Sequence, residues 1–304
     1  MHTRESLKRD IERAGLQKGD VVFIRISYKA VGKVEGGPQT VIDAILDVIG
    51  KEGTLLATAF PLRIISYKRF FHRKEVYYKG MKPRTGIIPV LMAENPMSKF
   101  SGHPISPYVV IGKYADEITS FHTPESESYD IVKFILNRYS PKCLRVGGKL
   151  LDGTTHLAFS DGLRNTGNFQ RRLGKGMYYM KDGKKTWMKR SVSSFCYNGF
   201  KDFFMKNIYN TDAVLFEGKI GEGEAMVTDM KKTYAIEHNL LLNNPKLLSC
   251  NSPECFMCQA TYSYSETRKY IARMLKKLGG KELIVSLKRI YAVALIYLFG
   301  RKCV

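Results

Sequence analysis

The side chains of this 304-residue sequence best suited to acid–base chemistry are three of its 6 histidines, His103, His122 and His156. An imidazole with an ordinary pKa of about 6.5 can accept a proton near neutral pH and return it, so each could act as a general base. The alternative for each is structural: a ring that organises a turn, fills a buried polar position or sits near a helix end. The residue type alone leaves both interpretations open.

A cluster of cysteines is the second group with chemical potential. Cys250, Cys255 and Cys258 lie close together among 6 cysteines. Three thiolates could bind zinc, with His238 or Cys303 as a fourth ligand. The spacing also occurs in some iron–sulfur proteins, which need a further cysteine. Reduced, unliganded thiols are the default for a cytoplasmic protein, so we expect no metal.

The amino-terminal part predicts the framework that positions these groups. An apolar run over 21–24 is typical of a buried strand, and apolar residues at helical spacing over 41–49 predict a helix that Thr40 could cap. A second apolar strand follows over 54–60. Strand, helix and strand in this order indicate a βαβ unit with a parallel pair.

A glycine loop, Gly36-Gly37, precedes that helix. Free backbone N–H groups and the positive end of a helix suit a phosphate or a thioester carbonyl. Gly36, Gly37 and Thr40 are therefore candidate cofactor-binding residues. An ordinary tight turn is the alternative, because any such turn uses glycine.

The rest of the chain up to about residue 250 continues the α/β pattern. Residues 67–84 are basic and aromatic without periodicity, and we expect an excursion or lid there. The remaining predicted elements are helices over 4–14, 87–94, 114–119 and 228–242, strands over 108–111, 142–146 and 213–217, and a hairpin over 175–190 that turns at Asp182-Gly183.

The charge balance is strongly positive, with 49 Lys and Arg against 28 Asp and Glu, a formal net charge of +21. Such a field concentrates anions, including nucleic acid, anionic lipid and phosphorylated small molecules, and it opposes a polycationic substrate. Residues 1–20 are charged and lack the apolar stretch of a signal peptide, so we expect a cytoplasmic protein.

Residues 251–304 form a basic extension in our prediction, separate from a domain over 1–250. Its apolar stretch over 290–299 is about ten residues, too short for a bilayer core of about 30 Å. Apolar residues of 271–278 share one helical face, so this helix either lies on anionic membrane or packs on the main domain.

Four blocks, in order, resemble the aminoglycoside 3-N-acetyltransferase family. Residues 21–60 are similar to its opening motif, in which a strand ends in a serine turn and a paired-glycine loop and a Thr-Val helix follow. The other blocks are 101–106 around His103-Pro104, 154–158 around His156, and 218–221. The resemblance covers roughly residues 5 to 250, and it implies an α/β fold with a central mixed β-sheet flanked by helices.

The resemblance also implies an activity: transfer of an acyl group from acetyl-CoA or another acyl-CoA to an amino group of an amino sugar. It makes His156 the general base, with Asp161 or Asp152 orienting its ring, and it places His103 in the wall of the active site. Ser106, a hydrogen-bond donor there, and Ser27, the remaining residue of the acyl-binding motif, join the glycine loop as cofactor-binding residues.

Three positions depart from the family pattern. Arg25 stands where the family has histidine, Ile26 replaces a serine, and Phe159 occupies a position that is usually acidic. They motivate an alternative, an inactive family member that binds membrane or nucleic acid through its charge. No recognised nucleic-acid motif occurs, so no specific nucleic-acid partner is expected.

We therefore favour the enzyme, and we expect an anionic acceptor. A nucleotide- or lipid-linked amino sugar suits the positive field better than a cationic antibiotic does. This context would be surface polysaccharide biosynthesis, with a peripheral contact at the inner face of the membrane.

Overall fold

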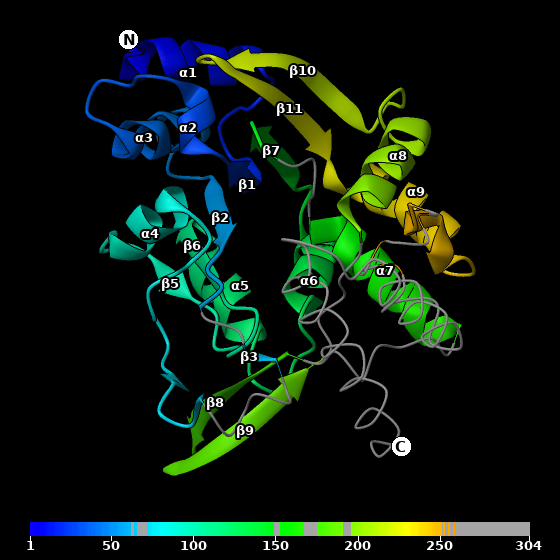
Figure 1. The fold of residues 1–304 in the computed structure, drawn as a ribbon. Helices are drawn as coiled ribbons and strands as arrows, with labels where there is room; N and C mark the ends of the chain where they lie inside the picture. The colour runs from blue at the N-terminus through cyan, green and yellow to red at the C-terminus, as the bar shows by residue number, and fades with distance from the viewer. Residues whose placement is uncertain are drawn as a thin grey trace, which may run out of the picture.

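The computed structural model describes residues 1–61, 64–65, 72–148, 153–166, 175–190 and 196–250, together with Ser252, Cys255 and Cys258. They form an α/β fold around a seven-stranded mixed sheet with helices on both faces (Figure 1), as predicted. The rest of the expected basic extension over 251–304 lies outside the described residues, so its helix and its membrane contact stay predictions.

Three parallel strands form the centre of the main sheet. The parallel strands β1 (Val21–Ile26) and β2 (Thr54–Thr58) are joined through helix α3 (Pro38–Ile49), which confirms the predicted βαβ unit. On the other side of β1, strand β7 (Lys142–Val146) pairs parallel to it. β11 pairs antiparallel to β7, and β6 antiparallel to β2. In spatial order the strands are β10 (Val214–Ile220), β11 (Gly223–Asp229), β7 (Lys142–Val146), β1 (Val21–Ile26), β2 (Thr54–Thr58), β6 (Tyr108–Gly112) and β5 (Lys99–Phe100).

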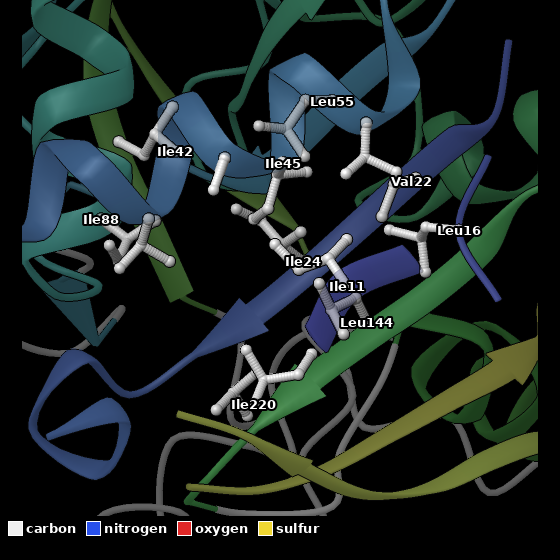
Figure 2. Close-up of a cluster of buried hydrophobic side chains, with 14 of the residues drawn as sticks. Ile11, Leu16, Val22, Ile24, Ile42, Ile45, Leu55, Ile88, Leu144 and Ile220 are labelled. Carbon is white, nitrogen blue, oxygen red and sulfur yellow. The ribbon is translucent and has the colours of Figure 1, made fainter. Parts of the chain in front are cut away.

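Strand β1 is buried on both faces, and this divides the core into two layers. Val22 and Ile24 pack in one cluster with residues of the helices on that side, as Figure 2 shows. Val21 and Phe23 point to the opposite face and join the second cluster. The helices beside the first cluster are α1 (Arg4–Arg13), α3 (Pro38–Ile49) and α4 (Ile87–Glu94), and those beside the second are α5 (Ala115–Phe121), α6 (Asp130–Arg138) and α7 (Gly153–Asn165).

A third apolar cluster joins the outer side of α7 to two more helices. These are α8 (Tyr197–Asn207) and α9 (Met230–Leu241), followed by the short 3-10 helix η2 (Pro245–Leu248). Phe159 of α7, Phe200 and Phe204 of α8, and Leu241 of α9 are fully buried there. Phe159, a departure from the family pattern, is therefore part of the packing that fixes α7.

A separate four-stranded sheet contains the predicted hairpin. Its members are β3 (Ile64–Ile65), β4 (Val76–Tyr77), β8 (Lys175–Lys181) and β9 (Lys184–Arg190). The turn between β8 and β9 has Asp182 at φ 50° and Gly183 at φ 72°. Two successive positive φ angles match the twist of a two-residue hairpin, which explains the Asp-Gly signal. Part of the excursion expected over 67–84 supplies β4.

Several predicted boundaries were wrong, and two of them bear on helix starts. α3 begins at Pro38, not at residue 41, and its N-cap is Gly37; the Thr40 hydroxyl instead donates to the Glu35 carbonyl at 2.6 Å. Residues 223–229 form strand β11, so helix α9, predicted over 228–242, begins only at Met230. Asp229 is its N-cap and accepts from two backbone N–H groups. Helix α7 has weak apolar periodicity because its polar residues are buried too, and it was predicted only as a motif.

In the part of the chain that the structure describes, no helix has both the length and the apolar composition needed to cross a bilayer.

The close packing of α7 against α9 generates a stability prediction. A Cβ atom on Gly162 would collide with the backbone carbonyl of Leu241, which cannot rotate away as a side chain could. We expect Gly162→Ala to lower the free energy of unfolding by about 1–3 kcal/mol, as overpacking does, measured by urea denaturation. Gly102→Ala is the control, because its Cβ would meet only ordinary contacts at 3.6 Å and beyond. Equal stability of both variants would contradict the prediction.

Candidate active site

A cleft of about 880 Å³ opens at the carboxyl ends of the three parallel strands. It is lined by residues 25–27 after the buried part of β1, by Thr58 and Phe60 at the end of β2, and by Gly147-Gly148 after β7. Parallel strands end at the same edge of a sheet, and ligands of open α/β folds commonly bind there. Topology alone therefore brings three distant segments of the chain to one site.

The turn after β1 is fixed by backbone hydrogen bonds and by a glycine. The N–H of Ser27 donates to the Val146 carbonyl at 2.9 Å, which extends the pairing of β1 with β7. Ser27 then serves as the N-cap residue of the short helix α2 (Tyr28–Val31). Gly147 has φ 62°, and a side chain there would collide with Ala30. The glycine thus lets α2 lie against the strand end, which keeps Ser27 in the cleft wall. A cofactor-binding residue, as predicted for Ser27, must lie there.

His156 lies in the same cleft, in the first turns of α7. Its ring stacks on that of Tyr129, with centroids 5.3 Å apart and planes 8° from parallel. Behind it, the Thr155 hydroxyl donates to the buried carboxylate of Glu237 at 2.5 Å, which ties α7 to α9. His156 is thus a partly exposed imidazole on a rigidly packed helix, which is the placement a general base needs.

Asp161 does not accompany His156 into the cleft. Five residues further along a helix of 3.6 residues per turn, it lies about 140° around the axis. Its carboxylate accepts from the Tyr234 hydroxyl at 3.1 Å and lies 3.6 Å from the Arg164 guanidinium. The structure therefore gives Asp161 a role in joining α7 to α9 and not in orienting His156. Asp152, the other predicted partner, lies outside the described residues.

His103 and Ser106 are buried behind the cleft rather than in its lining. His103 Nδ1 accepts from the backbone N–H groups of Ile105 and Ser106 at 3.2 and 3.0 Å, so this nitrogen is unprotonated. The ring stacks on His122, with centroids 4.7 Å apart. His122 in turn packs edge-on against Tyr108, which does line the cleft. The structure favours the alternative for His103: it organises the turn that supports the cleft wall.

The predicted glycine loop contributes to the cleft only through its end. Pro38, the first residue of α3, lines the cleft, whereas Gly36, Gly37 and Thr40 do not. Gly36 and Gly37 both have φ 74°, which L side chains rarely adopt, so they shape the approach to the helix. The positive end of α3 is thereby set at the cleft wall, where it favours negative charge.

Comparison with known proteins agrees with this arrangement. The sequence model described as aminoglycoside 3-N-acetyltransferase matches residues 23–131, from β1 to the start of α6. Aminoglycoside N(3)-acetyltransferase III from Salmonella is 25% identical over 219 residues, which cover 67% of this chain and 75% of the relative. The chain is therefore similar to the aminoglycoside 3-N-acetyltransferase family, as its sequence motifs predicted.

Solved structures of acetyltransferases share the fold. The structure of AAC-IIIb with CoASH is 21% identical and has a TM-score of 0.66, covering 83% of this chain and 99% of that one. The structure of AAC-VIa bound to sisomicin is 19% identical with a TM-score of 0.65, covering 79% of this chain and 97% of that one. The predicted mixed α/β fold is thus confirmed, and the matching sequence model and curated relative support the predicted resemblance to the family.

The cleft is positive in its described lining. Arg25 and Lys29 are among the residues that line it, and no Asp or Glu occurs among the described lining residues. Arg25, noted in the sequence as a departure from the family pattern, is therefore a cleft residue. Two cations with no carboxylate among the described lining residues favour an anionic ligand and disfavour an ammonium group.

Aromatic residues also line the cleft, and no sequence motif predicted them as part of the site. Phe60, Tyr108 and Tyr129 all line it. Tyr129 occupies the N-cap position of α6, where no motif marks it, and its stacking on His156 depends on the placement of two helices. Spacing along the chain carries no signal for such a contact.

Burial of His122 makes the stability of this acetyltransferase fold depend on pH. Burial lowers the pKa of His122 from 6.5 to about 4. Between these values the unfolded chain takes up a proton that the folded chain does not, so stability is full above pH 6.5 and falls toward pH 4. We expect a loss of about 3 kcal/mol from this group.

Urea denaturation of His122→Gln across pH 4–7 checks this expectation. The variant should show a shallower loss of stability on acidification than the unmodified chain, whatever its stability at pH 7. His2→Gln, which changes a partly exposed histidine at the amino terminus, is the control and should keep the original slope. An unchanged slope in His122→Gln would contradict the assignment.

Proposed function

We propose that this chain transfers an acetyl group from acetyl-CoA to an amino group of an amino sugar. The single observation that carries the proposal is the position of His156, an accessible imidazole in the cleft at the carboxyl ends of the parallel strands. Similarity to the aminoglycoside 3-N-acetyltransferases supports an acyl-CoA-dependent N-acetyltransferase. A related structure with CoASH supports coenzyme A as the carrier, and another with sisomicin supports an amino-sugar acceptor.

The reaction follows from the groups in the cleft. A sugar amine is largely protonated at neutral pH, so it first loses one proton to solvent. His156 accepts the second proton as the neutral nitrogen attacks the thioester carbonyl. The new C–N bond forms as the C–S bond breaks, the imidazolium returns this proton to the departing sulfur, and coenzyme A leaves as a free thiol. We assign the Ser27 hydroxyl, in the wall beside the end of β1, the role of donating to the carbonyl oxygen as its charge grows.

We further propose that the acceptor is anionic, such as a nucleotide- or lipid-linked amino sugar in surface polysaccharide biosynthesis. Recognition of an aminoglycoside calls for carboxylates that pair with its ammonium groups, and none occurs among the described residues of the cleft lining. Arg25 and Lys29 there, and a net charge of +21 over the chain, favour phosphate groups instead. These positive charges would attract both the phosphates of coenzyme A and those of the acceptor.

Release of free thiol from acetyl-CoA, measured against nucleotide-linked amino sugars and aminoglycosides in parallel, tests the proposal. We expect turnover with an anionic acceptor. Turnover with aminoglycosides alone would contradict the proposal of an anionic acceptor, but it would still support acetyltransferase activity. If the chain neither turns over any acceptor nor binds coenzyme A, the enzymatic function is wrong and the inactive, charge-binding alternative is favoured.

Two variants of α7 test the assigned base. His156→Ala should lower kcat by about 10²–10⁴-fold, the usual contribution of a general base. Asp161→Asn should keep kcat within a few fold, because its carboxylate faces Tyr234 and Arg164. Circular dichroism and Tm measurements verify that both variants fold. If both variants fold and lose kcat to a similar extent, Asp161 orients His156 after all. That result would contradict the role of Asp161 in joining α7 to α9 alone.

Neutralising the cleft cations tests how phosphates are held. Arg25→Gln and Lys29→Gln should raise the KM for acetyl-CoA or for the anionic acceptor several-fold and weaken the dependence of kcat/KM on salt. Lys201→Gln, an exposed change of the same charge on α8, is the matched control. If all three variants behave alike, only the overall charge matters and the cleft cations have no specific role.

A further inference from the structure

Four cysteine side chains meet at one point outside the cleft. The sulfur atoms of Cys196, Cys250, Cys255 and Cys258 all lie within 4.8 Å of one another. The sequence pointed to the last three, with His238 or Cys303 to complete a site. Among the described residues the fold supplies Cys196, which precedes α8 and is distant in the chain, and not His238. Cys303 lies outside the described residues.

The spacing of the sulfurs fits a single bound ion. Cys250 Sγ and Cys258 Sγ are 3.7 Å apart, far beyond the about 2.05 Å of a disulfide bond. Four sulfurs placed tetrahedrally at about 2.3 Å from one zinc ion are about 3.8 Å from each other. An iron–sulfur cluster contains several irons between its thiolates and needs a wider cage. The arrangement therefore matches one tetrahedral ion.

The local backbone is built to bring these thiols together. A Cβ on Gly199, in the first turn of α8, would collide with the Leu248 carbonyl and lie 2.7 Å from the Cys250 nitrogen. Glycine thus permits the segment that carries Cys250 to pass directly over the start of α8. Leu248, buried in the third apolar cluster beside Phe200, holds that segment in place.

A hydrogen bond to sulfur and a helix end each stabilise negative charge at one cysteine of the cluster. The Cys250 N–H donates to Cys258 Sγ at 3.4 Å. Cys196 is the N-cap residue of α8, where the positive end of the helix stabilises an anion. Backbone N–H groups that donate to sulfur are a usual second layer around a metal–thiolate site.

We propose that Cys196, Cys250, Cys255 and Cys258 bind one zinc ion. Each thiol gives its proton to solvent and forms one Zn–S bond. Four protein ligands close the coordination sphere and leave no position for substrate, so the ion is structural and not catalytic. None of the four cysteines lines the cleft. The ion fastens the segment after η2 to the start of α8 and so anchors the point where the basic extension begins.

Metal content of the full-length protein tests the proposal first. Elemental analysis should find about one zinc per chain, and removal by a chelator should lower the Tm by more than about 5 °C, restored by zinc. Replacement by Co²⁺ should give the intense visible bands of tetrahedral cobalt with sulfur-to-metal charge transfer. One iron per chain would overturn zinc as the ion. Folded protein that holds no metal and gives no cobalt–thiolate spectrum would overturn the site.

Variants identify the fourth ligand. Cys196→Ser and Cys258→Ser should lower zinc affinity by at least about 10-fold and weaken the charge-transfer bands. Cys143→Ser, a change at a buried thiol in β7, and His238→Asn, the alternative ligand from the sequence, should keep full metal content. If a ligand variant does not fold, Gly199→Ala, which keeps all four thiols but disturbs the approach of residues 248–250 to α8, should show the same loss. Retained affinity in Cys196→Ser with loss in His238→Asn would contradict the proposed ligand set.

Discussion

Burial of strand β1 on both faces is the constraint on which the rest of the structure depends. Its side chains alternate between two apolar layers, Val22 and Ile24 on one and Val21 and Phe23 on the other. A strand covered on both sides must be central, and parallel neighbours on each side follow from the crossover through α3 and from the pairing with β7. The carboxyl ends of three strands then meet at one edge, and the cleft is the space they leave.

The chemistry of the cleft is a consequence of that edge. Turn residues after β1 and β7 supply Ser27 and the glycines beside it, while α7 brings His156 from the second layer. Packing of α7 against α9, through Thr155 and Glu237 and through the close approach at Gly162, fixes where the imidazole stands. The fold is shared with solved acetyltransferases, and the cations Arg25 and Lys29 in the cleft lining attract anions.

Much of the fold could be predicted from the sequence, because β1, α3, β2, α4, β7 and the hairpin have strong local signals of periodicity and turn chemistry. His156 and Ser27 were predicted through motifs, and both lie in the cleft. Asp161 was assigned by closeness in sequence, but helical rotation turns it to Tyr234. His103 was assigned through the resemblance, but burial commits it to its own turn. Tyr129 and Cys196 could not be found, since each acts through a contact between segments far apart in the chain.

The most direct test of the central claim is an experimental structure of the chain with coenzyme A bound. We expect the ligand in the cleft at the carboxyl ends of β1, β2 and β7, with its phosphates toward Arg25 and Lys29 and its thiol beside Ser27, close to the ring of His156. Coenzyme A bound elsewhere, for example on the outer basic surface with the cleft empty, would contradict the proposed site.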